Sequence, residues 1–325
     1  MFGKSTLFIS HILHQRPNKY RILYMDNPYK CCNLCPRRCK VDRTTGVGFC
    51  RCGDVPLVNL YKLHFGEEPV ISGTRGSGTV FFEGCGTGCV FCQNHVISTG
   101  PTGKGTPCDA SGLAEIYLEL QEQGAHNVNL VTPMHHAPVI AESLRLARDQ
   151  GLILPVAVNS SGYDSVDTLR MLAGLVDIYM PDMKFCSGDL AGKFARCRDY
   201  WGVATLAIDE MVRQVGDIKL GDDGMLRSGV IVRHLMLPGC LFDSRKILEY
   251  LTSRYGNRIY ISLMSQYTPM PHILSDPDAD ARLKRTLSPR HYELMCDLLA
   301  DLGQENAFVQ ETGSVGDDLI PEFNV

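Results

Sequence analysis

The strongest signal in this chain is the stretch FEGCGTGCVFCQN at residues 82–94. It places Cys85, Cys89 and Cys92 in a C-x3-C-x2-C pattern on one short, glycine-rich loop. Three thiolates at this spacing can ligate three irons of a four-iron cubane, which leaves the fourth iron without a protein thiolate. The glycines keep side-chain bulk out of the loop, so backbone N–H groups can approach the sulfides. The stretch therefore predicts a [4Fe–4S] cluster with one open iron.

Two other interpretations of these cysteines are a chance spacing and a zinc site. Three cysteines at this fixed spacing would arise by chance only roughly 0.03 times in a chain of this composition. A structural zinc site normally takes four ligands, often as two C-x2-C pairs. The pattern therefore favours the iron–sulfur interpretation.

The cysteine content of the whole chain points the same way. Nine of the 14 cysteines lie between Cys31 and Cys92, in a chain of 325 residues with no recognisable secretory signal. Clustered thiols in a chain of this size indicate metal ligation in a reducing compartment, whereas disulfides are typical of small secreted chains. We therefore expect a cytoplasmic protein.

Composition excludes little else. The formal net charge is −4 and 44% of the residues are hydrophobic, as in an ordinary globular protein. This balance does not favour nucleic acid or an anionic membrane as a partner. No apolar run reaches the ~18 residues that a membrane-spanning helix needs.

A second group of cysteines precedes the first. Cys32, Cys35, Cys39 and Cys50, here called the N-terminal thiol set, have the spacing C-x2-C-x3-C-x10-C, with Arg37, Arg38 and Arg43 close by in the sequence. Four thiolates make a closed site for either a second [4Fe–4S] cluster, structural or electron-carrying, or Zn²⁺. The arginines would offset the negative charge of such a site. The spacing does not decide between the two metals.

From residue 79 onward the sequence alternates between strand and helix patterns. We expect strands over 79–82, 128–131, 154–158, 177–180, 230–234 and 259–263, with a last short strand over 307–309. We expect helices over 113–123, 140–147, 166–175, 204–215, 245–255 and 290–302. Repeated βα units require parallel strands joined by right-handed crossovers, and about six units are too few for a closed eight-stranded barrel. The predicted fold class is α/β, a partial (β/α)6 TIM-type barrel with a small Cys-rich N-terminal extension.

The predicted domain organisation follows from these patterns. Residues 1–26 are expected to be an N-terminal extension, residues 27–75 a Cys-rich metal-binding segment, and residues 76–325 the partial barrel. The metal would hold together a segment that cannot stabilise itself by apolar burial alone.

Polar or special residues follow the predicted strands at the point where each strand ends. They are Cys85, Thr132, His135, Asn159, Asp182, Lys184, Pro238 and Gln266. Because ligands of such sheets bind at the carboxyl ends of the strands, we expect these residues to share one site.

At this point the sequence resembles a known superfamily, the radical S-adenosylmethionine (SAM) enzymes, through its C-x3-C-x2-C motif and the aromatic Phe91 before the last cysteine. It is most similar to the pyruvate formate-lyase activating enzyme family, in its PflX-like branch. The matching segments are 32–50, 85–94, 129–136, 159–163, 177–184, 233–239 and 264–269. The resemblance implies a radical SAM core fold. It also implies that SAM binds the open iron and that the reduced cluster cleaves it to a 5′-deoxyadenosyl radical, which abstracts hydrogen.

The resemblance also implies which residues contact SAM. Activating enzymes usually carry a Gly-Gly-Glu-like turn after the second strand, whereas this chain has Thr-Pro-Met-His-His at 132–136. Thr132 or His135 could therefore contact the SAM amino group, or the two histidines could simply face solvent. Asn159 and Ser161 occupy the position of a loop that contacts ribose and carboxylate, although a serine here is also typical of a helix N-cap.

Two further strand ends carry charged candidates. Lys184 could neutralise the SAM carboxylate, or it could form a surface pair with Asp182. Arg233 and His234 begin a segment similar to the family's fifth-strand motif. An arginine inside an apolar strand needs a partner, and we expect a carboxylate of SAM or of Asp182.

Three functions are compatible with the sequence. The first is an activase-like radical SAM enzyme that abstracts hydrogen from a glycine of a partner, a glycyl radical enzyme. The second is radical SAM modification of a small molecule or peptide. The third is a non-catalytic iron–sulfur electron carrier, which would not need the polar residues at the strand ends. Both enzymatic interpretations imply an external electron donor such as a flavodoxin or ferredoxin.

Overall fold

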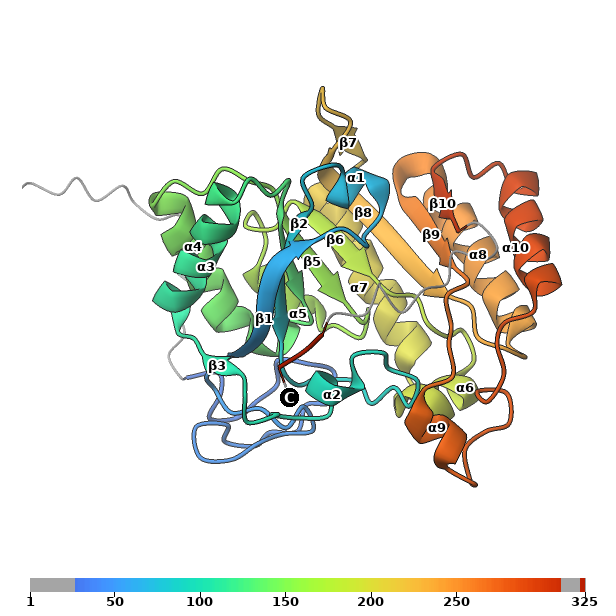
Figure 1. Cartoon of the computed structure of the whole chain (residues 1–325), viewed down its shortest axis with the longest axis horizontal. Helices are drawn as coiled ribbons and strands as arrows, with labels where there is room; N and C mark the ends of the chain where they lie inside the picture. Colours follow the sequence, from blue (N-terminus) through green and yellow to red (C-terminus); the bar gives the residue numbers. More distant parts are fainter. Residues whose placement is uncertain (1–26, 311–321, 325) are drawn as a thin grey trace, which may run out of the picture.

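The computed structural model describes residues 27–310 and 322–324. The expected N-terminal extension, residues 1–26, lies outside this range. A mostly parallel sheet runs through the molecule in the order β10-β9-β8-β6-β5-β4-β2-β1-β3 (Figure 1). Its parallel strands are β2 (Ser77–Phe82), β4 (Val128–Val131), β5 (Val156–Ser160), β6 (Ile178–Pro181), β8 (Leu226–Leu235), β9 (Tyr260–Met264) and β10 (Ala307–Val309).

The helices that connect these strands pack around the sheet in Figure 1. They are α3 (Ala110–Glu122), α4 (Ala137–Asp149), α5 (Val166–Met171), α6 (Gly188–Ala195), α7 (Tyr200–Val215), α8 (Leu241–Tyr255) and α10 (Pro289–Asp301). Helix α3 shows how the sequence builds them. The Asp109 carboxylate accepts a hydrogen bond from Gly112 N (2.9 Å) as an N-cap, and Leu113, Tyr117 and Leu120 are buried on one face.

The predicted fold class is confirmed: an open, partial βα barrel with a Cys-rich segment at its N-terminus. All seven predicted parallel strands form, each within a few residues of its expected position. Strand β2 is buried along its whole length, as is β4, as expected for strands covered on both faces.

Three antiparallel strands were not predicted, one of them the two-residue β7 (Lys219–Leu220), which pairs with β8. Strand β1 (Leu57–His64) pairs with β2, and the two-residue β3 (Thr106–Pro107) pairs with β1. Because β1 belongs to residues 27–75, that segment contributes a strand to the main sheet. The apolar alternation of β1 is weak, with exposed residues in its middle, so it carried no clear strand signal.

The remaining short elements lie between these units. They are α1 (Pro69–Ser72), α2 (His95–Ser98), η1 (Met134–His136), β7 (Lys219–Leu220), η2 (Gly256–Arg258) and α9 (Pro271–Ser275). No helix in the described part of the chain is long and apolar enough to cross a membrane.

The Cys-rich segment before β1 consists of turns rather than helices or strands. It lies at the lower end of the molecule in Figure 1, together with α2 and α9. A small cluster of Tyr29, Cys32 and Leu34 packs it onto the barrel, and Thr168 of α5 donates a hydrogen bond to the Leu34 carbonyl (2.7 Å). The segment therefore covers the end of the barrel at which β2 leads into the three clustered cysteines.

Candidate functional site

The loop from residue 83 to 94, here called the cluster loop, follows directly from β2. Gly84 begins it with φ +79°, and a Cβ at this position would lie 2.1 Å from Cys52 Sγ, so only glycine fits. Thr87 holds the loop from inside, because its N–H donates to Cys85 Sγ (3.4 Å) and its hydroxyl lies 3.2 Å from the same sulfur. Ser98 Oγ donates to Cys92 Sγ (3.4 Å).

The three cluster-loop thiols line one pocket of about 230 Å³ with residues from the carboxyl ends of the strands. The sequence-predicted residues that share this strand-end pocket are Cys85, Cys89, Cys92, Thr132, Asn159, Ser161, Asp182, Lys184 and Arg233. The fold thus brings together residues from β2, β4, β5, β6 and β8 that are far apart in the sequence.

The donor set of this pocket fits a [4Fe–4S] cluster. Three thiols face one space without a fourth cysteine in the pocket lining, as a cubane with an open iron requires. Burial raises the pKa of Cys92 to about 12 and also raises that of Cys85, and the neighbouring thiols add to both shifts. Such thiols lose their protons when a metal binds them.

Lys184 lines the same pocket as these thiols. It forms an ion pair with Asp182, and both side chains are about one-fifth exposed. Burial disfavours the lysine charge, but Asp182 and the thiol of Cys89 outweigh it and raise the pKa of Lys184 above its usual value. The lysine therefore stays protonated and places a fixed positive charge beside the thiols.

Tyr200, on α7, fixes the loops that carry several of these residues. Its hydroxyl lies 2.7 Å from the Ser161 carbonyl and 2.8 Å from the Asp182 carbonyl, and it accepts from Lys184 N (3.0 Å). Gly162 lets the same loops approach closely, since a Cβ there would lie 2.1 Å from the Asp182 carbonyl oxygen.

Arg233 pairs differently from the expectation. Its guanidinium bonds Glu68, with Nε donating to Oε1 at 2.9 Å, and also bonds Glu67. Asp182, the expected protein partner, bonds Lys184 instead. Glu67 and Glu68 precede helix α1 and reach across to β8, a contact that no local pattern in the sequence signals.

Thr132 has an unusual backbone conformation. It follows β4 with φ +59°, a region that β-branched residues rarely adopt, and its N–H donates to the Asn159 carbonyl (2.8 Å). Strain of this kind persists only where the surroundings impose it, and it is commonest at functional sites.

His135 and His234 do not line the strand-end pocket. His135 is buried beneath the cluster loop, where its Nε2–H donates to the Glu83 carbonyl (3.1 Å), and burial lowers its pKa to about 3. His234 donates from Nδ1 to the Met183 carbonyl (2.7 Å), and its Nε2 lies 2.9 Å from Ser244 Oγ. Both rings are internal hydrogen-bonding groups in this structure, and their contact with SAM stays a prediction.

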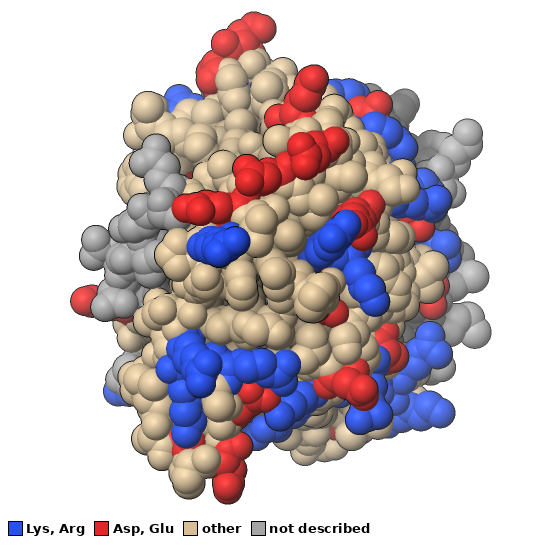
Figure 2. Space-filling model, turned by 90° about the vertical axis from the view of Figure 1, so that its right-hand side faces the viewer, with Lys and Arg blue, Asp and Glu red and all other residues tan. Residues whose placement is uncertain are grey.

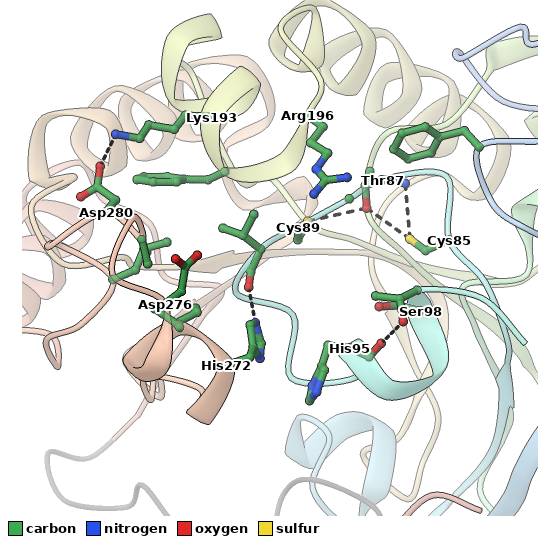
Figure 3. Close-up of a pocket in the computed structure, with 18 of the residues that line it drawn as sticks. Cys85, Thr87, Cys89, His95, Ser98, Lys193, Arg196, His272, Asp276 and Asp280 are labelled. Atoms are coloured by element: carbon green, nitrogen blue, oxygen red, sulfur yellow. Dashed lines mark hydrogen bonds and ion pairs between the residues drawn. The ribbon is translucent and has the colours of Figure 1, made fainter. Parts of the chain in front are cut away.

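A larger cavity, of about 660 Å³, opens on another side of the cluster loop (Figure 3). Cys85, Thr87 and Cys89 line it, and Arg51 of the Cys-rich segment and Arg196 after α6 contribute positive charge. On its far side, Lys193 pairs with Asp280 (2.6 Å), and His272 Nε2 donates to the Val90 carbonyl (2.8 Å). Two cavities therefore meet at the same two cysteines.

Sequence reasoning missed the residues that position the site rather than line it. Tyr200, Glu67 and Glu68 act from elements that are distant in the sequence. A buried polar residue in an otherwise apolar stretch would have been the only signal for Tyr200. Gln266, predicted at the end of a strand, does line the strand-end pocket.

Comparisons with known proteins give one clear relative. No family model matches the chain. It is 31% identical over 265 residues to MJ0674, an uncharacterized protein of Methanocaldococcus jannaschii, in an alignment that covers 79% of this chain and 72% of that protein.

Among the solved structures that are also similar, two serve as examples. One is SuiB of Streptococcus suis bound to S-adenosylmethionine, with TM-score 0.48, 13% identity and coverage of 70% of this chain and 48% of SuiB. The other is methylornithine synthase (PylB), with TM-score 0.45, 12% identity and coverage of 73% and 72%. The chain thus spans about half the length of SuiB.

Proposed function

This chain belongs to the same family as the archaeal protein MJ0674, and we propose that it is a radical SAM enzyme whose [4Fe–4S] cluster is held by Cys85, Cys89 and Cys92. The observation that carries the proposal is the strand-end pocket. Three thiols at C-x3-C-x2-C spacing face the same space as polar residues from the ends of several parallel strands. An electron carrier has no need of such a convergent polar pocket.

When bound, a reduced cluster with SAM at its open iron supplies a 5′-deoxyadenosyl radical that abstracts hydrogen from an unactivated C–H bond. The chain's own residues would hold the amino acid part and the ribose of SAM. Lys184 carries the positive charge that a SAM carboxylate needs, while Asp182 keeps the lysine oriented. Asn159 and Ser161 offer short polar side chains at the end of β5.

The site is also shielded from bulk water on one side. The Cys-rich segment covers the end of the barrel, and Cys35 lies against Gly86 of the cluster loop. Exclusion of water protects a reactive radical from side reactions. The 660 Å³ cavity on the other side of the loop remains as a route for a partner or substrate.

We further propose that the hydrogen comes from a glycine of a partner enzyme. This assignment rests on the resemblance to pyruvate formate-lyase activating enzymes, and an open cavity beside the cluster loop is compatible with an inserted peptide segment. A small molecule or a free peptide is the alternative donor. Transfer of deuterium into 5′-deoxyadenosine from a partner labelled at its glycines would support the glycine of a partner enzyme as donor. Transfer only from labelled small metabolites would support a small molecule as donor.

The electron donor would dock near the cluster loop. Lys and Arg side chains gather in the lower part of the face in Figure 2, toward the end of the molecule where α9 lies. Arg51, Lys193 and Arg196 are exposed at the larger cavity. Lys193 is neutralised by Asp280, and Asp276 and Asp278 also line this cavity, so Arg51 and Arg196 are the cations left to attract an acidic partner such as a flavodoxin or ferredoxin. Association through these two arginines would depend on salt.

The experiment is anaerobic reconstitution with iron and sulfide, followed by reduction with dithionite in the presence of SAM. Chromatography measures 5′-deoxyadenosine. We expect product from the wild-type chain and a loss of at least about a hundredfold in Cys89→Ala, because a cubane held by two thiolates does not present SAM correctly.

Cys296→Ala is the matched control, since Cys296 lies on α10 and lines neither cavity. It should form product at the wild-type rate. Equal product from Cys89→Ala and the wild type would contradict the proposal. So would a confirmed, reducible cluster that never cleaves SAM with any tested partner or metabolite.

A further inference from the structure

The N-terminal thiol set comes together in space although it lies on irregular turns. A Cβ on Gly48 would lie 2.8 Å from Cys39 Sγ and 3.9 Å from Cys50 Sγ, so these two thiols flank one glycine. Cys39 packs against the small cluster that contains Cys32, the Lys40 N–H donates to the Cys32 carbonyl (2.9 Å), and the Arg38 N–H donates to the Cys35 carbonyl (3.0 Å). The four cysteines therefore lie on one compact set of turns.

The backbone of this segment is held in conformations that need support. Of the five described non-glycine residues with positive φ, three are here: Arg38 (44°), Lys40 (55°) and Arg51 (60°). Each lies next to a cysteine. Such conformations are costly and persist only where the surroundings fix them. The segment has no helix or strand of its own, so ligation of its cysteines would add to the turn hydrogen bonds and the small apolar cluster that hold these conformations.

Arg43 supplies an independent argument for a negatively charged centre. Its side chain is 1% exposed, yet none of its partners in the described residues is a carboxylate. It donates to the backbone carbonyls of Cys52 and Gly53 and to Cys32 Sγ (3.7 Å). A buried cation needs compensating charge. Four thiolates around a metal provide it.

The spacing of the sulfurs favours a cluster over zinc. Tetrahedral zinc, with Zn–S about 2.3 Å, holds its thiolates about 3.8 Å apart. Among the described residues, no three sulfurs of this set lie within 4.8 Å of one another. The same is true of Cys85, Cys89 and Cys92, the set with the iron–sulfur motif. A cubane binds each thiolate at a different corner and therefore spreads its ligands further.

One other group does bring three ligand atoms within 4.8 Å: Cys52, His135 and His136, all buried. The Arg43 guanidinium, however, lies 3.5 Å from His136 Nδ1. A divalent cation there would face this buried positive charge, so the group is better suited to hydrogen bonding than to metal binding.

The N-terminal thiol set touches the cluster loop directly. A Cβ on Gly86 would lie 3.8 Å from Cys35 Sγ, and Gly86 is the immediate neighbour of Cys85. Arg37 Nε donates to the Gly86 carbonyl (3.0 Å), and Cys52 Sγ donates to the Glu83 carbonyl (3.2 Å). A single residue of backbone therefore separates the two sets of thiols.

We propose that Cys32, Cys35, Cys39 and Cys50 hold a second [4Fe–4S] cluster, and that electrons reach the cluster at Cys85, Cys89 and Cys92 through it. The redox role rests on the proposed function; the identity of the metal does not. A low-potential one-electron donor, such as reduced flavodoxin or ferredoxin, would reduce the second cluster by one electron. That electron would then reduce the first cluster, and the second would return to its oxidised state.

The identity of the metal is tested on the full chain, reconstituted anaerobically with iron, sulfide and an equal amount of zinc. We expect about eight irons per wild-type chain and about four in the triple variant Cys85→Ala/Cys89→Ala/Cys92→Ala, with little zinc in either. About four irons and one zinc in the wild type would overturn the proposal, whether or not the triple variant folds.

Proximity is tested by electron paramagnetic resonance of the reduced protein. Two reduced clusters this close should broaden or split each other's signals in the wild type, while the triple variant should show one simple signal. A wild-type spectrum that is the plain sum of two independent signals would contradict the contact between the sites.

Electron transfer is tested by freeze-quenching. The quantity measured is the rate at which the cluster at Cys85, Cys89 and Cys92 is reduced, not the amount of 5′-deoxyadenosine formed. In Cys35→Ala, reduction by flavodoxin should slow by about tenfold or more, while reduction by the small molecule dithionite should change less than about twofold. Cys296→Ala should resemble the wild type with both reductants. Unchanged reduction by flavodoxin in Cys35→Ala would overturn the relay. A chain that passes these tests but cleaves no SAM would refute the proposed function and not the second cluster.

Discussion

The cluster loop and the Cys-rich segment both present cysteines to one end of the barrel, but they are supported in opposite ways. The cluster loop emerges from β2, a strand that is buried along its entire length and paired on both sides. The Cys-rich segment before β1 has no helix or strand and a core of only three buried apolar residues. The barrel can therefore position the cluster loop before any metal binds, whereas we expect the Cys-rich segment to depend on the metal proposed for its cysteines.

This difference separates two uses of a metal in one chain. At the cluster loop, a site that is already formed binds the group that does the chemistry. In the Cys-rich segment, we expect binding of the proposed metal and ordering of the chain to be a single event, so that the free energy of binding is also free energy of folding. Removing metal should consequently affect the two regions very differently.

The largest expected effect is on local stability after metal removal. Stripping iron and zinc with a chelator should expose the Cys-rich segment to trypsin at Arg38, Lys40 and Arg51, since a structural metal contributes on the order of 10 kcal/mol to such small units. The strands of the barrel should stay protected. Mass spectrometry of the fragments over time measures this, and equal cleavage of the metal-bound and stripped chains would refute the comparison.

The next largest effect concerns the barrel. Arg233→Met should destabilise it by about 3–5 kcal/mol in denaturant unfolding, because it leaves Glu67 and Glu68 buried without their cation. The control is Arg254→Met, which removes the more exposed pair with Asp209 and should cost less than about 1 kcal/mol. A similar loss in the free energy of unfolding in the two variants would show that the buried ion pair stabilises the protein no more than the exposed one.

The same ion pair predicts a pH dependence. Burial opposes ionisation of Glu68, but Arg233 outweighs it and lowers the pKa of the carboxyl below its usual 4.5. A carboxyl with a depressed pKa contributes stability that is fully present above pH 4.5 and is lost as the pH falls through the folded-state value. Acid unfolding curves should show this loss in the wild type, and Arg233→Met should show less of it. A wild-type curve that is flat below pH 4.5 would contradict the pairing.

A smaller effect is expected at Arg43. Arg43→Lys keeps the charge but cannot reach the carbonyls of Cys52 and Gly53 and the sulfur of Cys32 together. We expect a loss of about 2 kcal/mol, confined to the Cys-rich segment, from hydrogen exchange. Arg198→Lys, at an exposed position, is the control. A loss of protection that spreads evenly over the barrel strands would argue against separate support of the two regions.

The sequence predicted the barrel far better than it predicted the support of the site. Apolar strands followed by amphipathic helices are local patterns, so β4, β5 and α4 could be placed from their own residues. The pocket lining was predictable too, because parallel strands bring their carboxyl ends together. The pairing of Arg233 with Glu67 and Glu68 joins residues that are 165 or more positions apart, and no local pattern encodes it.

The smallest expected effect tests whether the barrel end is strained for function. Thr132 has φ +59°, and glycine adopts this conformation without penalty. Relief of the strain, about 1–3 kcal/mol, is partly offset by the greater freedom of glycine in the unfolded chain, so Thr132→Gly should stabilise the protein by about 1 kcal/mol. At the same time it should weaken SAM binding, measured by calorimetry on the reconstituted protein, because the pocket loses a positioned polar group. Ala137→Gly, in the buried first turn of α4, is the contrasting control and should destabilise. If Thr132→Gly destabilises the protein as much as Ala137→Gly does, the left-handed backbone at the end of β4 does not store strain. The barrel end would then be held in place by Tyr200 and by the ion pairs of Arg233 with Glu67 and Glu68.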